Sequence, residues 1–330
     1  MGFKRIDRFI IIILLFFLFF LVYLLIMNDK EDSRVELDDS IVFMKPNLSY
    51  LNLSFHASRL ISNFNCSREH LRLLIVVTSN VSSVYRRNTI RMTWGRSLKQ
   101  HQTNEFKIYF VVGKINDQDT MSKLDKESKQ HNDIIIGDYT EHFYNLSYKF
   151  ETIFEWAYKY CSYDYLLKTD DDVFVNLPLV MDLLGHAKTP KNKVYLGLRH
   201  HHPRVARSGK YSVTYEEYAA KTYPDYCGGG AVIFSNDVVK NVIPYFQKSP
   251  FKLDDVYVGM LVYNSGCEPI LNECFDLLDE SCSFKNNSLA THSTLHTRNR
   301  NCILKLYYSM LANSVDNLFA RTHYIDAKLS

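Results

Sequence analysis

The sequence is poor in glycine and proline, with 12 and 8 residues among 330, so it lacks the composition of a disordered or fibrous protein. It also lacks a dominant charge. Its 39 basic and 36 acidic side chains leave a net charge of only +3, too little to indicate nucleic acid or a polybasic surface partner. Internal repeats and low-complexity tracts are absent as well. The length allows one large α/β domain, or two smaller ones, with a sizeable core.

The longest apolar run, Phe9 to Met27, contains nineteen residues without a charge, glycine or proline. A helix of that length nearly spans a hydrocarbon core of roughly 30 Å. A cleaved signal peptide is the alternative, but its apolar region is usually shorter and ends at small residues. Basic residues precede the run and acidic residues follow it, so the positive-inside rule predicts a type II, single-pass protein. We expect a cytoplasmic tail at 1–8, a signal anchor at 9–27 and a luminal stem at 28–69.

Glycosylation sequons and cysteines agree with a luminal body. Six N-x-Ser/Thr sequons begin at Asn47, Asn52, Asn65, Asn80, Asn145 and Asn286. All seven cysteines lie beyond the apolar run, and an oxidising compartment would let up to three pairs form. Zinc at Cys267, Cys274 and Cys282 is the alternative, although these residues lack C-x-x-C spacing.

The compact domain is expected over 70–330. Short runs rich in apolar residues at 71–79, 106–113, 133–138, 164–170 and 193–198 predict buried strands. Segments with helical spacing separate them, most clearly 146–160. Strands that alternate with helices predict a mostly parallel sheet covered on both faces. In such sheets, ligands bind at the carboxyl ends of the strands.

Three consecutive carboxylates, Asp170 to Asp172, follow one predicted strand in the segment YLLKTDDDVFVN. Like charges so close together in a half-buried setting need a cation, and a hard divalent metal is the natural partner. A solvated acidic turn and a phosphatase-type D-x-D nucleophile are the alternatives. An EF-hand is excluded, since Phe174 and Val175 occupy positions that need further ligands and a glycine.

Two further motifs lie downstream. In LDDVYVGM, Asp254 and Asp255 enter a helix-compatible segment, where helix capping explains one carboxylate better than two. In YPDYCGGGAVIF, Gly228 to Gly230 precede a strand and permit either a tight turn or close approach of a ligand to the backbone.

A basic segment, RRNTIRMTWG, follows the first predicted strand. Its Arg87 and Arg91 are one helical turn apart, so both can face a diphosphate. A solvated helix face is the alternative interpretation.

These four segments, in this order, resemble the β-1,3-glycosyltransferase family of the Golgi over residues of about 70–300. RRNTIRMTWG is similar to the R-x-x-I-R-x-T-W signature of that family, and KTDDDVFVN to its D-x-D segment. YPDYCGGGAVIFS and LDDVYVGM resemble its glycine-rich strand and its E-D-V-Y-x-G motif, with Asp254 where many members have Glu. The resemblance implies a GT-A architecture, a Rossmann-like nucleotide half joined to an acceptor half within one domain.

The resemblance also implies residue roles. Asp172 would bind Mn²⁺ directly, with Asp170 and Asp171 on the ribose or on the waters of the metal. His292 would be a further metal ligand, and His296 is a poorer candidate. Asp255 would be the general base of an inverting displacement, and Asp254 would orient it or bind the acceptor. Arg87, Arg91 and Gly228 to Gly230 would contact the nucleotide sugar.

The function implied by the resemblance is transfer of galactose from UDP-galactose to a glycan on protein or lipid, forming a β-1,3 linkage. Transfer of N-acetylglucosamine or N-acetylgalactosamine is the alternative within the family. A non-catalytic, membrane-tethered carbohydrate-binding relative is the alternative outside catalysis, and it predicts a broken metal or base motif. The expected location is the Golgi membrane, with the catalytic domain in the lumen.

Overall fold

A computed structural model describes residues 57–58, 66, 69–96, 105–278, 281–292 and 302–314. All of them belong to one compact unit, 42–330. The predicted tail, the predicted anchor at 9–27, most of the predicted stem and His296 lie outside the described residues. Among the helices that are described, none combines the length and the apolar character that a membrane span requires.

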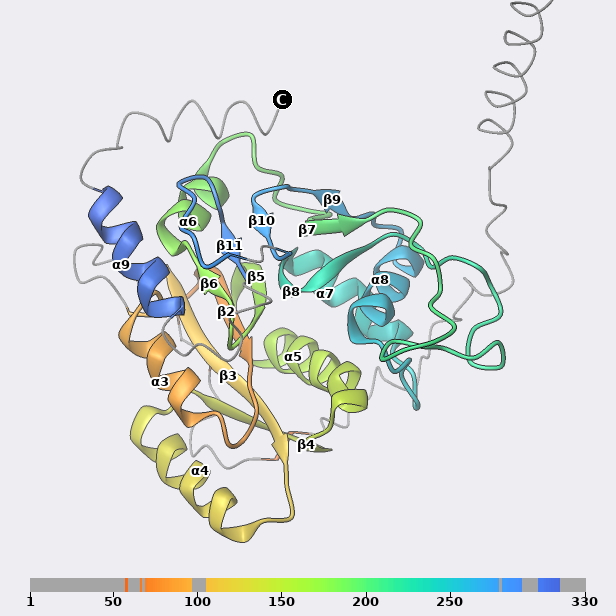
Figure 1. The fold of residues 1–330 in the computed structure, drawn as a ribbon, viewed down its shortest axis with the longest axis horizontal. Coiled ribbons are helices and arrows are strands. Elements are labelled where there is room, and N and C mark those ends of the chain that lie inside the picture. Colours follow the sequence, from red (N-terminus) through yellow and green to blue (C-terminus); the bar gives the residue numbers. More distant parts are fainter. Residues whose placement is uncertain are drawn as a thin grey trace, which may run out of the picture. The chain divides into compact units, whose positions relative to one another are not determined.

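An eight-stranded sheet forms the centre of the unit, in the order β1-β4-β3-β2-β5-β8-β7-β9 (Figure 1). Its strands are β1 (Ala57–Ser58), β2 (Leu71–Thr78), β3 (Phe106–Lys114), β4 (Ile134–Thr140), β5 (Tyr163–Asp170), β7 (Tyr195–His200), β8 (Tyr226–Ser235) and β9 (Ile270–Leu271). The four strands β4, β3, β2 and β5 are parallel, and β8 pairs with β5 in the antiparallel sense. The predicted mostly parallel α/β sheet is therefore confirmed, as are its five predicted strands.

The core strands form because their sequences are apolar on both faces. Every residue of β2 except Arg72 is buried, and its β-branched run is typical of a strand covered on both sides. β2 pairs with β5 so that Thr78 lies beside Asp170 at the last rung. This register brings the carboxyl ends of the two central strands to one edge of the sheet, which is where ligands bind in such folds.

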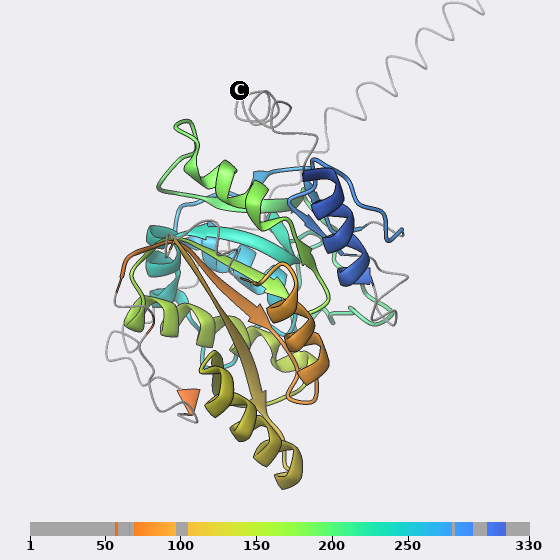
Figure 2. The same ribbon diagram turned by 90° about the vertical axis from the view of Figure 1, so that its left-hand side faces the viewer.

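Helices cover both faces of the sheet. The helices are α3 (Val84–Met92), α4 (Gln118–His131), α5 (Leu146–Tyr160), α6 (Leu177–Gly185), α7 (Asn236–Val242), α8 (Asp254–Asn264) and α9 (Cys302–Ser314), with short 3₁₀ turns at η2 (Phe143–Asn145) and η3 (Ile243–Tyr245). Figure 2 shows the sheet between α5 on one side and α3 on the other. Because β3 and β5 flank β2 on opposite sides, right-handed crossovers place α3 and α5 on opposite faces.

The predicted helix at 146–160 is confirmed as α5, and its apolar face is buried at Phe150, Ile153, Phe154 and Ala157. The ring of Phe154 packs against Phe234 of β8, with centroids 5.1 Å apart. α5 also contacts α7 and α8. This layer therefore supports the end of the sheet at which β8 and α8 meet.

A small second sheet, β10-β11-β6, lies beside the carboxyl end of β5. It joins β6 (Phe174–Val175), which directly follows the aspartates, to β11 (Ala290–Thr291), and β11 to β10 (Phe275–Asp276). This pairing brings a segment more than 110 residues downstream to the aspartate turn, because Thr291 is the register partner of Phe174.

The cysteines form two disulfides among the described residues, Cys66–Cys161 and Cys282–Cys302. Cys227, Cys267 and Cys274 are buried thiols. Because Cys282 is paired with Cys302, it is not available to the zinc site that was an alternative for Cys267, Cys274 and Cys282.

The boundary between stem and domain at residue 70 stays a prediction, although described residues on its stem side contact the sheet region. β1 pairs with β4 through Ala57 and Ser58, and the buried Cys66 is bonded to Cys161 after α5. A short edge pairing thus joins Ala57 and Ser58 to β4, and a disulfide joins Cys66 to the residue after α5.

Candidate active site

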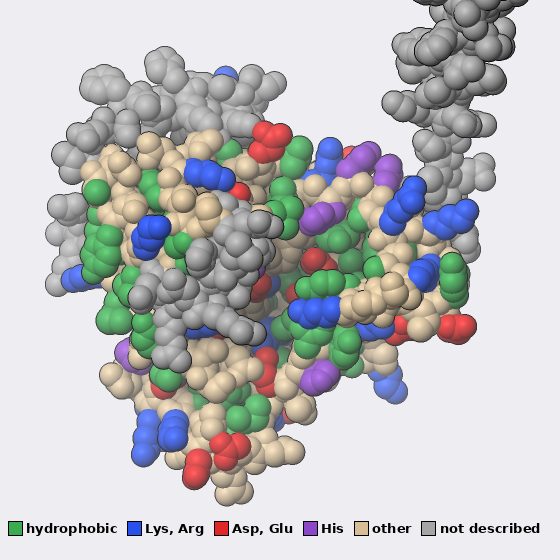
Figure 3. Space-filling model, viewed as in Figure 1, with side chains coloured by type: hydrophobic (Ala, Val, Ile, Leu, Met, Phe, Trp, Pro, Cys, Tyr) green, Lys and Arg blue, Asp and Glu red, His purple; other side chains and the backbone are tan. Residues whose placement is uncertain are grey.

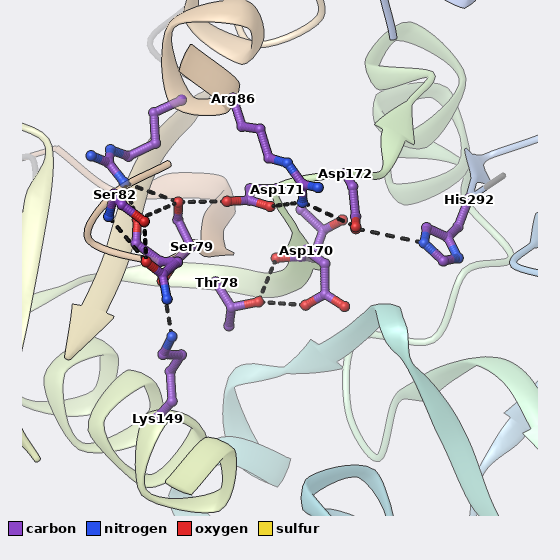
Figure 4. Close-up of polar contacts among 12 residues, drawn as sticks. Thr78, Ser79, Ser82, Arg86, Lys149, Asp170, Asp171, Asp172 and His292 are labelled. Atoms are coloured by element: carbon purple, nitrogen blue, oxygen red, sulfur yellow. Dashed lines mark hydrogen bonds and ion pairs between the residues drawn. The ribbon is translucent and has the colours of Figure 1, made fainter. Parts of the chain in front are cut away.

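The three aspartates form a turn between β5 and β6, and each has different partners (Figure 4). Asp170 ends β5 and accepts hydrogen bonds from Thr78 Oγ1 and from Lys168 Nζ, the latter at 2.7 Å. Asp171 is buried and accepts from Ser79 Oγ at 2.6 Å and Arg86 Nη1 at 2.7 Å. Burial raises the pKa of Asp171, although Ser79 and Arg86 oppose the shift. The turn is therefore held in place by residues that follow β2.

Asp172 points away from Asp171 toward His292 (Figure 4). The His292 Nε2 atom lies 3.6 Å from Asp172 Oδ1, and Arg86 Nη1 lies 3.1 Å from Asp172 Oδ2. Burial tends to raise the pKa of Asp172, but His292 and Arg86 hold it below its usual range. The contact with Asp172 in turn raises the pKa of His292. The structure thus brings together two residues, 120 positions apart, that were expected to bind one metal.

The donor set at Asp172 fits a divalent cation. Carboxylate oxygen suits Mn²⁺, and imidazole nitrogen is a common partner of divalent transition metals. Two ligands, each about 2.1 Å from one ion, are separated by roughly 3–4 Å, and the observed 3.6 Å falls in that range. The guanidinium of Arg86 lies against Asp172, so positive charge already compensates this carboxylate. Sequence reasoning did not assign Arg86 a role, although it stands beside Arg87 in the motif.

Lys168 is the second residue that sequence reasoning left without a role. Its side chain is buried within β5, and its Nζ atom donates to Asp170 at 2.7 Å and to the Gly229 carbonyl at 2.5 Å. Burial alone lowers the pKa of Lys168, but Asp170, Asp254 and Asp255 raise it above its usual value. The sequence does contain a signal for this role, since Lys168 lies in a strand that is otherwise largely buried. A buried ammonium needs carboxylate partners, so carboxylates could be expected near it.

Asp254 and Asp255 lie in the first turn of α8 and interact electrostatically with Lys168. Burial raises the pKa of Asp254 to about 6 and also raises the pKa of Asp255, while Lys168 opposes both shifts. Asp255 Oδ1 accepts the backbone N–H of Val256 at 2.8 Å. Both carboxylates therefore lie at a helix N-terminus, as the sequence predicts, but in a setting that makes them more basic than ordinary aspartates.

The glycines of β8 face different protein groups, and Gly229 lies beside the first turn of α8. A Cβ atom on Gly229 would lie 3.4 Å from Asp255 Cβ and 3.8 Å from Lys168 Nζ. On the other face, a Cβ atom on Gly228 would lie 3.3 Å from His200 Nε2, and one on Gly230 3.5 Å from Leu277. Among the described residues, these three glycines thus contact protein groups on both faces of β8, and Gly229 is the one beside the carboxylates.

Arg87 does not have the geometry of a diphosphate ligand. It is fully buried in α3, and its five N–H groups are used by the protein. Two of them donate to Glu127 of α4 at 2.8 and 2.7 Å, and the others reach Ser79 Oγ and the carbonyls of Asn80 and Val81 at 2.5–3.1 Å. In this structure Arg87 instead joins α3 to α4 and to the loop after β2.

Arg91 lies on the same face of α3, as its spacing predicts, but this face meets carboxylates of the protein. Its guanidinium forms a two-point contact with Asp133, with both distances 2.8 Å, and also reaches Glu127. The two arginines therefore share Glu127 in a buried network. The two arginines thus share one face of α3, as their spacing predicts. In this structure their common partner is Glu127, whereas the sequence suggested a diphosphate.

Comparison with known proteins gives the family. A family model described as galactosyltransferase matches residues 85–273, more than half of the chain. The chain belongs to the galactosyltransferase family. The match includes the aspartate turn, the glycines of β8 and the first turn of α8, whereas His292 lies beyond it.

Curated relatives agree with this galactosyltransferase-family assignment. The chain is 33% identical over 204 residues to β-1,3-galactosyltransferase 5 of Mus musculus, covering 61% of this chain and 66% of the relative. It is 31% identical over 215 residues to lactosylceramide 1,3-N-acetyl-β-D-glucosaminyltransferase of Xenopus tropicalis, covering 62% and 57%. The matched part thus spans somewhat under two thirds of these relatives. The predicted resemblance to β-1,3-galactosyl- and N-acetylglucosaminyltransferases is confirmed.

Solved structures add little to the assignment. The crystal structure of S. aureus TarS 1-349 aligns with a TM-score of 0.37 and 11% identity, over 78% of this chain and 70% of the other. A likeness at that level carries no argument about the site.

Proposed function

We propose that this protein transfers a hexose from a UDP-sugar to a glycan hydroxyl with inversion, forming a β-1,3 linkage. The observation that carries the proposal is that Lys168 interacts with carboxylates of both acidic motifs. It donates to Asp170 at 2.7 Å and interacts electrostatically with Asp254 and Asp255, while Asp172 of the same turn as Asp170 lies beside His292. The non-catalytic alternative predicts that one of these groups is broken, whereas both are assembled.

Asp172 and His292 are the proposed ligands of Mn²⁺, and Asp170 and Asp171 support this turn from β5. When bound, such an ion would act as a Lewis acid for the departing diphosphate. Arg86 donates to Asp171 and Asp172, so its positive charge lies beside the proposed metal ligand Asp172. Its guanidinium N–H groups are also suited to binding phosphate.

Asp255 is the proposed general base. An inverting displacement needs a carboxylate opposite the leaving group to take the proton of the acceptor hydroxyl. Burial makes both aspartates of α8 better proton acceptors, and the backbone N–H of Val256 orients Asp255. Asp254, which lies on the same turn and also interacts with Lys168, is proposed to orient Asp255 or to bind the acceptor.

The proposed donor is UDP-galactose, and the second candidate is UDP-N-acetylglucosamine, because the relatives include transferases of both kinds. The test is hydrolysis of UDP-galactose, UDP-N-acetylglucosamine and UDP-N-acetylgalactosamine by the purified protein without acceptor. We expect slow turnover of UDP-galactose above the other two. Turnover of none of the three in the presence of Mn²⁺ and a glycan acceptor library would argue for the non-catalytic alternative.

We also propose a Golgi membrane location with a type II anchor at 9–27. The two disulfides support a domain that folds in an oxidising lumen. The test is extraction of the expressed protein with alkaline carbonate, after which we expect it in the membrane pellet with glycans on Asn47 and Asn52. A secreted form that begins near residue 28 would contradict this.

A further inference from the structure

A long loop between β7 and β8, residues 201–225, presents aromatic side chains to solvent beside those of η2. Tyr211 and Tyr215 of the loop are 54% and 65% exposed, and Phe143 and Tyr144 of η2 are 38% and 47% exposed. Phe143 lies 5.3 Å from Tyr144 and 6.1 Å from Tyr211, measured between ring centroids. We call the group Phe143, Tyr144 and Tyr211 the aromatic platform. Exposed apolar surface that gathers in one place marks an interaction site.

Basic side chains lie against the rings of the platform. The Lys210 ammonium lies 4.7 Å from the Phe143 centroid and 5.0 Å from that of Tyr211, and the Lys252 ammonium lies 5.9 Å from that of Tyr144. Figure 3 shows basic and hydrophobic side chains next to each other over this loop. Such a surface combines exposed aromatic rings with ammonium groups that lie over one face of the rings and can donate hydrogen bonds.

The loop that carries Tyr211 is held in one conformation by polar contacts. Arg207 donates to four backbone carbonyls of the loop, at Val213, Thr214, Tyr218 and Ala220, over 2.7–3.0 Å. At the base of the loop, Asp225 accepts from the His201 ring at 2.7 Å and from the backbone N–H of His202 at 2.9 Å. Structureless loops of this length in compact domains are usually functional, and a fixed loop loses little entropy when it binds.

The platform lies beside the turn that carries the proposed base. Lys252, which contacts Tyr144, precedes Asp255 by three residues, a chain length of at most about 11 Å. Ser147, four residues after Phe143, donates to the carbonyl of Phe251 in the same turn. Lys252 also pairs with Glu217 of the loop at 2.8 Å. The platform, the loop and the start of α8 are therefore tied together.

We infer that the aromatic platform binds the acceptor oligosaccharide beyond its terminal sugar, an inference that rests on the proposed function. The C–H faces of sugar rings pack on aromatic rings, and their hydroxyls accept hydrogen bonds from the flanking ammonium groups. The occupant is an oligosaccharide because the platform adjoins the proposed base. A membrane surface, which also favours aromatic and basic residues together, is the competing partner.

The test is a glycan array probed with the purified protein, with Phe143→Ala/Tyr211→Ala as the variant. Tyr158→Ala is the matched control, since Tyr158 is a 42% exposed aromatic residue on α5 and no part of the platform. We expect the variant to bind its best oligosaccharides about tenfold more weakly, as for loss of a central aromatic contact. The control should bind these oligosaccharides as the wild type does. Both variants should melt at the same temperature as the wild type.

A turnover readout separates this inference from the proposed function. With the best array glycan as acceptor, the variant should raise its KM about tenfold, while kcat and UDP-sugar hydrolysis without acceptor stay unchanged. The inference is overturned if the wild type binds no oligosaccharide on the array, or if the variant binds them as the wild type does. It is also overturned if only binding to anionic lipid vesicles is lost. If the wild-type protein turned over no UDP-sugar, with or without acceptor, the proposed function would be refuted instead.

Discussion

Arg87 is the residue for which sequence and structure make opposite predictions, so its replacement is the sharpest test. Arg87→Met keeps an unbranched apolar stem but removes the guanidinium and its five buried donors, two of which pair with Glu127. Breaking a buried ion pair costs about 3–5 kcal/mol. Arg91 still contacts Glu127 after the change, so we expect the lower end, about 3 kcal/mol. Dividing by a urea slope of about 2–3 kcal/mol per M, the unfolding midpoint should fall by roughly 1 M.

The assay pairs urea unfolding with donor binding, and Arg86→Met is the matched control in the adjacent position. The Arg86 side chain is 38% exposed and contacts Asp171 and Asp172, so its loss should cost only about 1 kcal/mol of stability. Because it lies at the proposed donor site, Arg86→Met should weaken UDP binding in the presence of Mn²⁺. Folded Arg87→Met, measured without denaturant, should bind UDP nearly as tightly as the wild type.

The reverse pattern would refute this reasoning. An Arg87→Met protein with an unchanged urea midpoint but weakened UDP binding would return Arg87 to the donor site. It would also mean that the contacts with Glu127 contribute little to the stability of α3 and α4.

Three further predictions concern the metal, the base and the buried acids. EDTA should abolish transfer and Mn²⁺ should restore it, and Asp172→Asn should lose UDP affinity together with turnover; full activity in metal-free buffer would contradict the metal role. Asp255→Asn should lower kcat by about 10²–10⁴-fold while calorimetric UDP–Mn²⁺ affinity changes little, since it removes a proton acceptor; near-normal kcat would move the base to Asp254. Burial raises the pKa of Glu151 from 4.5 to about 8, so the folded state holds its proton at a pH at which the unfolded state releases it. Stability should therefore fall as pH rises from about 4.5 to 8. Glu151→Gln should make the melting temperature depend less on pH across that window, leaving the smaller contributions of Glu155, whose pKa is about 7, and Asp254, whose pKa is about 6.

Much of the fold could be predicted because its signals are local. The runs that became β2, β3 and β5 each contain consecutive apolar residues that are buried, which is typical of strands covered by helices on both faces. The apolar spacing of α5 likewise predicts the face it buries. β1 could not be found in this way, because a two-residue edge strand has no periodicity and is recognisable only by its partner β4.

Within the candidate site, local motifs identified carboxylates but not the partners of the basic residues. Asp170 to Asp172 and Asp254 to Asp255 stand out because clustered acids next to apolar segments are uncommon. Nothing in the sequence distinguishes Arg86, which faces the aspartates, from Arg87, which faces Glu127. On a helix, adjacent residues point about 100° apart, so the choice depends on where the neighbouring elements lie.

The strands, the main helices, the order of the motifs and the family resemblance can all be predicted from the sequence, because each of these depends on residues close together in the chain. Three contacts are visible only in the folded chain: Asp172 lies beside His292, Lys168 interacts with carboxylates of both acidic motifs, and buried Arg87 pairs with Glu127. These contacts join residues up to 120 positions apart. Their geometry follows from strand register and helix packing, which a local pattern of residues does not encode.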